Sequence, residues 1–295
     1  SMDSYRQQEI EHEDHAWSLL ERSPGLTLSY PAVDPDRIKA PVFAVRLGRG
    51  PADDELPLHS HRKGQLVIAE NGSLTCRVEN GIWMVPTFGA FWVPGGIAHS
   101  NSVSPNGSVI CVFVESEASG LPNRCCTLGV SPLIRVITDA LTQRSVRYAP
   151  DSPSGRLAQV LMNEFASAPV SYQHLPMSSD PRLVEVAEHL LADPADRRTV
   201  AEWATLLAMS ERSFSRWIVR ETGLTFGQWR RQLHGLVALE RLSAGSSVNI
   251  IAQDLGYEST SAFITMFKKV FGDSPRRYLR QIEETGRLGG TAQPV

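Results

Sequence analysis

Short apolar runs alternate with turn residues from about residue 26 to residue 117. The runs PVFAVRLG, GQLVIAE and SVICVFVE are each long enough to form one strand. The dipeptides Asn71-Gly72 and Asn80-Gly81 fall between such runs, and Asn-Gly is typical of tight hairpins. Many short strands at regular spacing predict a β-sandwich or β-barrel in this part of the chain.

The hydrophobic period changes to that of a helix from about Pro132. Two apolar stripes recur every three or four residues and predict two amphipathic helices, which could pack on the β-domain or pair across a dimer. The stretch APVSYQHLPMSSDP follows, and its prolines and serines indicate a linker between domains. The stripes consist of Leu133, Ile134, Ile137 and Leu141, and of Leu157, Val160, Leu161 and Phe165.

The last third of the chain contains the pattern of a helix, a short turn and a second helix twice, at about 199–220 and 247–270. In the second copy, Gly256 permits the tight turn that two crossing helices need, and Ser259 can cap the helix that follows. Phe263, Phe267 and Phe271 recur every four residues and predict one buried face. The first copy has the same plan, with Ser210 as its cap.

Polar and basic residues occupy the opposite face of the second helix in each copy. Arginine suits the O6 and N7 atoms of guanine, and lysine, serine and threonine can contact phosphates and base edges. We therefore expect these two faces to contact DNA, with Arg212 or Arg216 at a guanine and Arg220 at a phosphate. The candidate residues are Arg212, Ser213, Ser215, Arg216, Arg220, Ser259, Ser261, Thr265, Lys268 and Lys269.

A third apolar period connects the two copies, through Trp229, Leu233 and Leu236 up to Leu242. A helix of about 18 residues there would be about 27 Å long. That length suits two recognition helices placed roughly one DNA turn, ~34 Å, apart on one face of a duplex. The spacing predicts two successive major-groove contacts by a single chain.

This C-terminal third resembles the DNA-binding domain of the AraC/XylS family of bacterial transcription regulators. The resemblance implies binding to double-stranded promoter DNA and contact with RNA polymerase if the protein is an activator. Two departures are local: Phe226 stands where the family usually has proline, and His234-Gly235 interrupts the connecting helix, where glycine should cost up to ~1 kcal/mol relative to alanine. The matching residues are Ser210-x-Arg212-x-Phe214-x-Arg216, Gly223, Ala252-x-x-Leu255-Gly256-Tyr257, Ser259, Ser261, Phe263, Phe267-Lys268, Gly272, Ser274-Pro275 and Tyr278.

A second resemblance lies in the β-rich part. His59-Ser60-His61, Gln65 and Pro94-x-Gly96-x-x-His99 are similar to the two motifs of the cupin fold, a small jelly-roll barrel. In metal-binding cupins the corresponding positions are three histidines and a glutamate, and this chain has Gln65 in place of the glutamate.

The histidines also carry a physical argument of their own. His59 and His61 are two apart on a strand, so both point to one face, and His99 could converge on them. Three imidazoles are a sufficient ligand set for Zn²⁺, Ni²⁺ or Fe²⁺, and the alternative is a polar pocket left by an ancestral metal site. The nearby aromatic residues could frame a ligand cavity or simply form core: Trp83, Phe88, Phe91 and Trp92.

Composition is that of an ordinary globular protein, with 42% hydrophobic and 21% charged residues. The net charge is −3, but residues 197–280 hold 13 lysines and arginines against 7 acidic residues, a net +6, and the rest of the chain holds 16 against 25, a net −9. A basic DNA-binding part joined to an acidic partner domain fits this asymmetry. The four cysteines lack CxxC spacing, no apolar run approaches the ~20 residues of a membrane span, and the polar N-terminus is no signal peptide. We expect a bacterial cytoplasmic protein, associated with the nucleoid when bound to DNA and without a membrane partner.

Together these patterns predict a multidomain α+β protein with an N-terminal cupin and an all-α double helix-turn-helix domain. We expect a lead at 1–25, the cupin-like sensor at 26–125, a helical dimerisation segment at 126–168, a linker at 169–181 and the DNA-binding domain at 182–285. The predicted function is a homodimeric, non-enzymatic transcription regulator, activator or repressor, that responds to a small molecule or a metal. The alternative is a cupin metalloenzyme, a dioxygenase or isomerase, with an appended DNA-binding domain; only the loop residues Asp53, Asp54 and Glu55 offer acids near the histidines.

Overall fold

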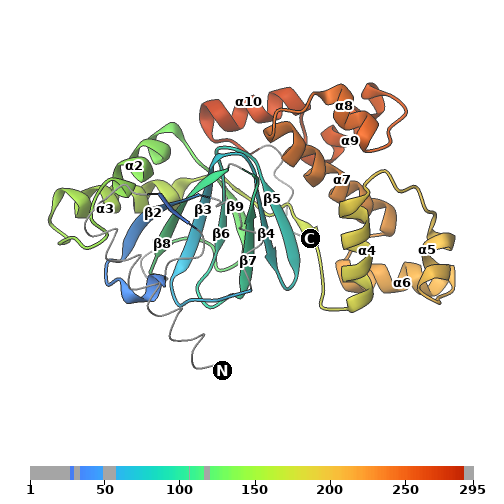
Figure 1. Ribbon diagram of the computed structural model, residues 1–295, viewed down its shortest axis with the longest axis horizontal. Coiled ribbons are helices and arrows are strands. Elements are labelled where there is room, and N and C mark those ends of the chain that lie inside the picture. The colour runs from blue at the N-terminus through green and yellow to red at the C-terminus, as the bar shows by residue number, and fades with distance from the viewer. Residues whose placement is uncertain (1–26, 30–33, 49–57, 106, 116–119, 289–295) are drawn as a thin grey trace.

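The computed structural model describes residues 27–29, 34–48, 58–105, 107–115 and 120–288 (Figure 1). The predicted lead at 1–25 and the loop residues Asp53, Asp54 and Glu55 lie outside these ranges. Within them, every helix is too short or too polar to cross a bilayer.

Two sheets form the N-terminal part. The larger has the strand order β1-β2-β8-β3-β6-β9-β10 and the smaller has the order β11-β5-β4-β7. All pairs are antiparallel except β1 with β2. The strands are β1 (Thr27–Ser29), β2 (Val42–Gly48), β3 (Gly64–Asn71), β4 (Leu74–Val78), β5 (Gly81–Val85), β6 (Gly89–Val93), β7 (His99–Val103), β8 (Ser108–Val114), β9 (Cys126–Gly129), β10 (Val170–Ser171) and β11 (Leu175–Pro176).

Three apolar layers stabilise this part because both faces of each sheet are covered. Along β3, Val67 packs between the two sheets, whereas Leu66 and Ile68 pack beneath helices α2 (Pro132–Thr142) and α3 (Pro153–Ser167). Along β5, Trp83 faces the inter-sheet core, whereas Ile82 and Met84 face the C-terminal helices. This alternation follows from the two-residue period of a strand. The sheets therefore lie between two helical layers (Figure 1).

The C-terminal part is all helical and packs around the long helix α7. Its apolar cluster includes Trp229 and Leu233 of α7, and each helix buries one stripe against it. The helices are α4 (Pro181–Ala192), α5 (Val200–Leu206), α6 (Glu211–Thr222), α7 (Phe226–Ser243), α8 (Val248–Asp254), α9 (Thr260–Phe271) and α10 (Pro275–Thr285).

The predicted fold class and the runs expected to form strands are confirmed, with three differences. Residues 126–129, within the segment expected to be helical, form β9 and pair with β6. The expected linker contains β10 and β11, each only two residues long, which extend the two sheets. The stripes on α2 and α3 are mostly covered by the larger sheet, where Ile134, Leu141 and Phe165 are buried. Leu133 and Val160 instead remain exposed.

Candidate functional site

Helices α5 and α6 form the first helix-turn-helix. Thr199 caps α5 in a capping box with Glu202, and the side chain of Ser210 caps α6 by accepting from the Ser213 amide. Phe214, Trp217 and Ile218 of α6 are buried, and Gly223 ends the helix with φ 77°. The inward stripe thus fixes which face of α6 is directed to solvent.

The solvent face of α6 holds all five residues predicted there, which are exposed. Arg220 forms an ion pair with Glu221, with a distance of 3.0 Å between Nε and Oε1. Arg212 and Arg216 make no ion pair within the described part of the chain, so their guanidinium groups are available to an anionic partner. The five residues are Arg212, Ser213, Ser215, Arg216 and Arg220.

Helices α8 and α9 form the second helix-turn-helix. Gly256 adopts φ 75° at the turn, a backbone conformation that favours glycine, and Ser259 caps α9 by accepting from the Ala262 amide. The Thr265 hydroxyl donates to the Ser261 carbonyl at 3.0 Å. Two predicted contact residues therefore already have intramolecular partners. All five predicted residues are exposed: Ser259, Ser261, Thr265, Lys268 and Lys269.

Helix α7 spans 18 residues between the two motifs, as the hydrophobic period predicts. Its two unusual residues have structural roles. A Cβ at Gly235 would lie 2.8 Å from Cγ1 of Val270, so glycine permits the close approach of α7 to α9. His234 Nε2 donates to the Pro194 carbonyl at 2.7 Å, and its Nδ1 accepts from the Tyr257 hydroxyl at 2.9 Å.

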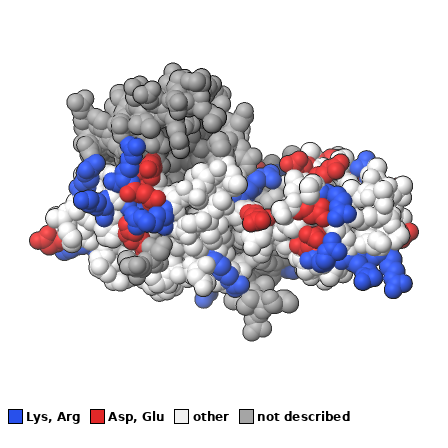
Figure 2. All heavy atoms as spheres, turned by 90° about the horizontal axis from the view of Figure 1, so that it is seen from below, with Lys and Arg blue, Asp and Glu red and all other residues white. Residues whose placement is uncertain are grey.

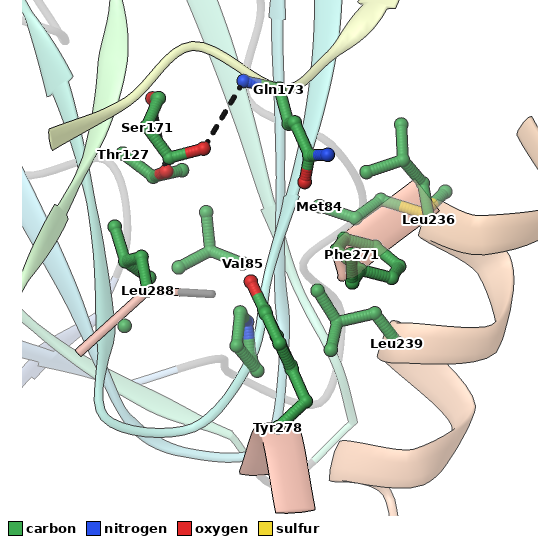
Figure 3. A pocket seen from close by; sticks show the side chains of 12 residues that line it. Met84, Val85, Thr127, Ser171, Gln173, Leu236, Leu239, Phe271, Tyr278 and Leu288 are labelled. Carbon is green, nitrogen blue, oxygen red and sulfur yellow. Dashed lines mark hydrogen bonds between the residues drawn. The ribbon is translucent and has the colours of Figure 1, made fainter. Parts of the chain in front are cut away.

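The helical domain is docked on both sheets, at β11 of the smaller sheet and at β9 of the larger one. The Trp229 indole donates to the Pro176 carbonyl at 2.9 Å, and a Cβ at Gly129 would lie only 1.8 Å from the Gly286 carbonyl oxygen. The cavity left in this seam is about 20 Å³, about enough for one water molecule (Figure 3). The seam is therefore closely packed rather than a site for an effector.

Figure 2 shows one face of the molecule in space-filling form. In Figure 2, Lys and Arg side chains project from the end formed by the helical domain, beside several acidic ones. This mixed surface agrees with a domain whose positive charge is moderate, so specific contacts rather than bulk charge must select DNA.

The three predicted histidines converge in the β-domain. Their ligand atoms all lie within 4.8 Å of one another, and the backbones of His59 and His99 form an isolated antiparallel bridge. Nδ1 of His61 donates to the Lys63 carbonyl at 2.6 Å, and Nδ1 of His99 donates to the Ile97 carbonyl at 2.8 Å. Burial lowers the pKa of His99 to about 4, so its ring is neutral at neutral pH and Nε2 keeps a lone pair.

Gln65 contacts both of these imidazoles. Its Oε1 lies 3.0 Å from Nε2 of His61 and 2.9 Å from Nε2 of His99, and its Nε2 donates to Sγ of Cys111. An amide oxygen only accepts, so it cannot bond a neutral Nε2 whose ring carries its proton on Nδ1. A bound cation would satisfy these converging lone pairs. Rotation of the Gln65 amide is the alternative, because its NH₂ would then donate to both rings and its oxygen would accept from the Cys111 thiol.

The aromatic residues expected around a ligand cavity divide among different parts of the structure. Phe91 packs against Trp83 in the inter-sheet core, Trp92 lies beneath α2 and α3, and Phe88 lies under the Arg135 guanidinium near the helical domain. Of the two alternatives, core packing describes Phe88, Phe91 and Trp92, whereas Trp83 also lines a cavity of about 550 Å³. The two faces of the larger sheet separate residues that are adjacent in sequence.

Sequence comparisons identify regulators that are similar to this chain. A family described as a helix-turn-helix domain matches residues 203–281. The chain is 43% identical over 249 residues to the HTH-type transcriptional regulator NimR of Escherichia coli (strain K12), covering 84% of this chain and 91% of the relative. It is 35% identical over 94 residues to the HTH-type transcriptional regulator RipA of Corynebacterium diphtheriae, covering 32% of this chain and 28% of that protein.

Among solved structures, ToxT from Vibrio cholerae aligns with 81% of this chain and 97% of its own, at 11% identity and TM-score 0.35. The DNA-binding domain of AdpA in complex with a target DNA aligns with 34% of this chain and 90% of its own, at 31% identity and TM-score 0.31. The relatives are named as regulators, and the comparisons lend no support to the enzyme alternative. With NimR matched over nearly its whole length, the chain belongs to the AraC/XylS family of helix-turn-helix transcription regulators and is a DNA-binding regulator rather than an enzyme.

Proposed function

We propose that this regulator contacts successive major grooves of its promoter site through α6 and α9 and changes its DNA affinity when the β-domain binds an effector. The observation that carries this proposal is the pair of capped helices with exposed polar faces, held apart by α7. Arg212 and Arg216 supply base contacts, and Arg220, Lys268 and Lys269 supply phosphate contacts. We infer from this proposed function a cytoplasmic protein that is on the nucleoid when bound to DNA.

Replacing the two free arginines of α6 tests the DNA contact. Each bidentate contact to guanine contributes ~1–3 kcal/mol, so Arg212→Ala with Arg216→Ala should weaken binding to a selected operator by at least about tenfold and relax base preference at that half-site. Fluorescence anisotropy measures the affinity. Arg144→Ala with Arg156→Ala removes the same charge from the sensor part and should have little effect. Equal losses of operator affinity in the two double variants would indicate only a nonspecific effect of removing positive charge.

We also propose that His59, His61 and His99 hold a divalent cation, Zn²⁺, Ni²⁺ or Fe²⁺, with the Gln65 oxygen beside it. The support is chemical: two imidazoles donate their Nδ1–H to backbone carbonyls, which directs the Nε2 lone pairs to the same amide oxygen. Backbone partners of this kind orient imidazoles that bind metals. When bound, the ion would supply an open coordination position for an effector.

Elemental analysis of the purified full chain tests the metal site. We expect close to one equivalent of metal in the wild type and less than a tenth of that in His61→Ala. His189→Ala changes a histidine of α4 outside the cluster and should leave the metal content unchanged. A metal-free wild type after reconstitution with each of the three ions would instead favour the rotated Gln65 amide and a purely hydrogen-bonded cluster.

The domain limits given above belong to the same proposal, with α2 and α3 as the dimerisation segment and 169–181 as the linker. A homodimer would place two DNA-binding domains on one promoter, and an activator would additionally contact RNA polymerase.

A further inference from the structure

A cavity of about 550 Å³ lies where the linker crosses the end of the smaller sheet. We call it the linker pocket, and the residues that matter for its chemistry are Glu79, Trp83, Ile97, Arg124, Tyr172 and His174. Its volume is within the range of roughly 300–1,000 Å³ that is usual for small-molecule sites, whereas the interdomain cavity holds about one water. His59, His61 and Gln65 do not line the linker pocket, so it is a separate site from the histidine cluster.

Flat rings form much of the wall. The rings of Trp83 and His174 are stacked, with centroids 4.4 Å apart and planes 15° apart. The Arg124 guanidinium lies 3.6 Å from the Tyr172 ring centroid, so that ring holds the cation at the edge of the cavity. Paired rings of this kind favour a planar ligand, because aromatic surfaces pack best against flat partners.

The wall offers two hydrogen-bond donors that matter for a ligand, the Trp83 indole and the Arg124 guanidinium. Trp83 is 3% exposed, and its indole N–H has no acceptor among the described residues. Burial lowers the pKa of His174, whose Nδ1 donates to the Tyr172 carbonyl at 2.7 Å, so the ring is neutral and adds no second cation. Arg124 and Glu79 are the charged residues of the lining, and both are exposed. Arg124 forms no ion pair within the described part of the chain, so its guanidinium can pair with one ligand anion, whereas Glu79 opposes a second negative charge.

We propose that the linker pocket binds a small planar aromatic carboxylate as the organic effector of this regulator. The ring system would lie against Tyr172 and His174, the carboxylate would pair with Arg124, and the unused Trp83 indole donor would bond a ligand oxygen. This inference rests on the proposed ligand response and specifies its site and its chemical class.

The linker connects this pocket directly to the second DNA-contacting helix. Tyr172 and His174 line the pocket, whereas the side chain of Gln173, between them, donates to the Val270 carbonyl of α9. Figure 3 shows Gln173 reaching toward Met84 and Phe271, on the side of the helical domain. Three residues after Gln173, the Pro176 carbonyl accepts from the indole of Trp229 in α7. A ligand that moves Tyr172 or His174 would therefore also bias the position of α9, which is what differential binding to two conformations requires.

Calorimetric titration of the full chain with 2-naphthoate, 1-naphthoate and indole-3-carboxylate tests the site, with the matching neutral carbinols as controls. We expect at least one acid to bind at micromolar concentration and its carbinol to bind at least tenfold more weakly. Arg124→Gln should weaken the acid at least tenfold, Arg124→Lys should restore part of the loss, and Arg156→Gln should bind as the wild type. Circular dichroism checks that each variant is folded.

The coupling is measured by operator affinity with and without the bound acid. Gln173→Ala should bind the acid normally and lose most of its effect on DNA. The proposal is overturned if no acid binds, if acid and carbinol bind equally, or if Arg124→Gln binds as the wild type. If operator binding is normal in any of those cases, only the effector site is wrong and the proposed DNA-binding function stands. If the wild type without ligand does not bind its operator, the proposed DNA-binding function is contradicted instead.

Discussion

Gly235 shows at the scale of one residue how packing can override helix propensity. It lies within α7, where alanine would normally gain up to ~1 kcal/mol over glycine. A Cβ there would meet Cγ1 of Val270 at 2.8 Å, and valine is stiff at χ1, so the contact cannot be relieved by a rotamer change alone. We expect Gly235→Ala to lower the free energy of unfolding by about 1–3 kcal/mol, the usual cost of overpacking.

Gly227 in the first turn of the same helix is the matched control, because its added Cβ would meet nothing within 4 Å. Gly227→Ala should raise the free energy of unfolding by about 0.5–1 kcal/mol. Urea denaturation of both variants measures the difference. If the two substitutions shifted stability in the same direction, the close approach of α7 to α9 would not explain the glycine.

Local residue chemistry was largely predictable, and tertiary roles were not. Ser210 and Ser259 cap their helices as expected, because a cap depends on the next three residues only. The contact of Gln65 with two imidazoles and the stacking of Arg124 on Tyr172 join residues distant in sequence. The cupin-like motif grouped Gln65 with the histidines, whereas no pattern in the sequence pointed to the pair of Arg124 and Tyr172, so the linker pocket had no sequence signal.

His234 links three elements of the helical domain, since it lies in α7 and bonds Pro194 after α4 and Tyr257 after α8. Burial lowers its pKa from an ordinary 6.5 to about 4. The unfolded chain therefore takes up a proton below about pH 6.5, whereas the folded chain resists it until about pH 4. The contribution of His234 to stability is complete above pH 6.5 and is lost as pH falls toward 4, by up to about 3 kcal/mol.

A His234→Gln variant isolates this effect from the other groups that titrate in acid. We expect it to be less stable than the wild type at pH 7.5 and to lose less stability between pH 7.5 and pH 4.5. Urea unfolding at several pH values gives both curves. Parallel curves over this range would show that the His234 proton does not control the stability of the domain.

Helices and strands were predictable from the sequence where their hydrophobic period is long enough to recognise. The 18 residues of α7 follow the predicted stripe, and both helix-turn-helix motifs lie where expected. Strand β7 contains His99, Ser100, Asn101 and Ser102, and this polar run gives no strand signal. Strands β10 and β11 are too short for any period and exist because β9 and β5 offer them partners.

At the scale of the whole molecule, the sheets lie between the pair α2–α3 and most of the helical domain (Figure 1). Helix α10 reaches α2, where Arg135 donates to the Glu283 carbonyl. The charge asymmetry and the linker composition predicted two unlike parts, but not that they share one apolar cluster. Ile82 and Met84 of β5 join that cluster from the sheet side, and in the sequence they look like ordinary strand residues. The docking of the helical domain on the sheets is therefore seen only in the structure.

The end formed by α2 and α3 carries the last prediction, which concerns the homodimer. Leu133 and Val136 are 49% and 67% exposed and lie three residues apart on one face of α2, and Val160 of the adjoining α3 is 42% exposed. Exposed apolar side chains of this size favour association when they share a surface. We expect light scattering of the full chain at micromolar concentration to give twice the 32.5 kDa chain mass.

Leu133→Glu with Val136→Glu should give a monomer that still binds a single half-site, because like charges facing each other across the two-fold axis oppose association. Leu206→Glu alters an equally exposed leucine of α5 and should remain dimeric. A wild-type monomer, or a double variant that stays dimeric, would exclude this face as the interface.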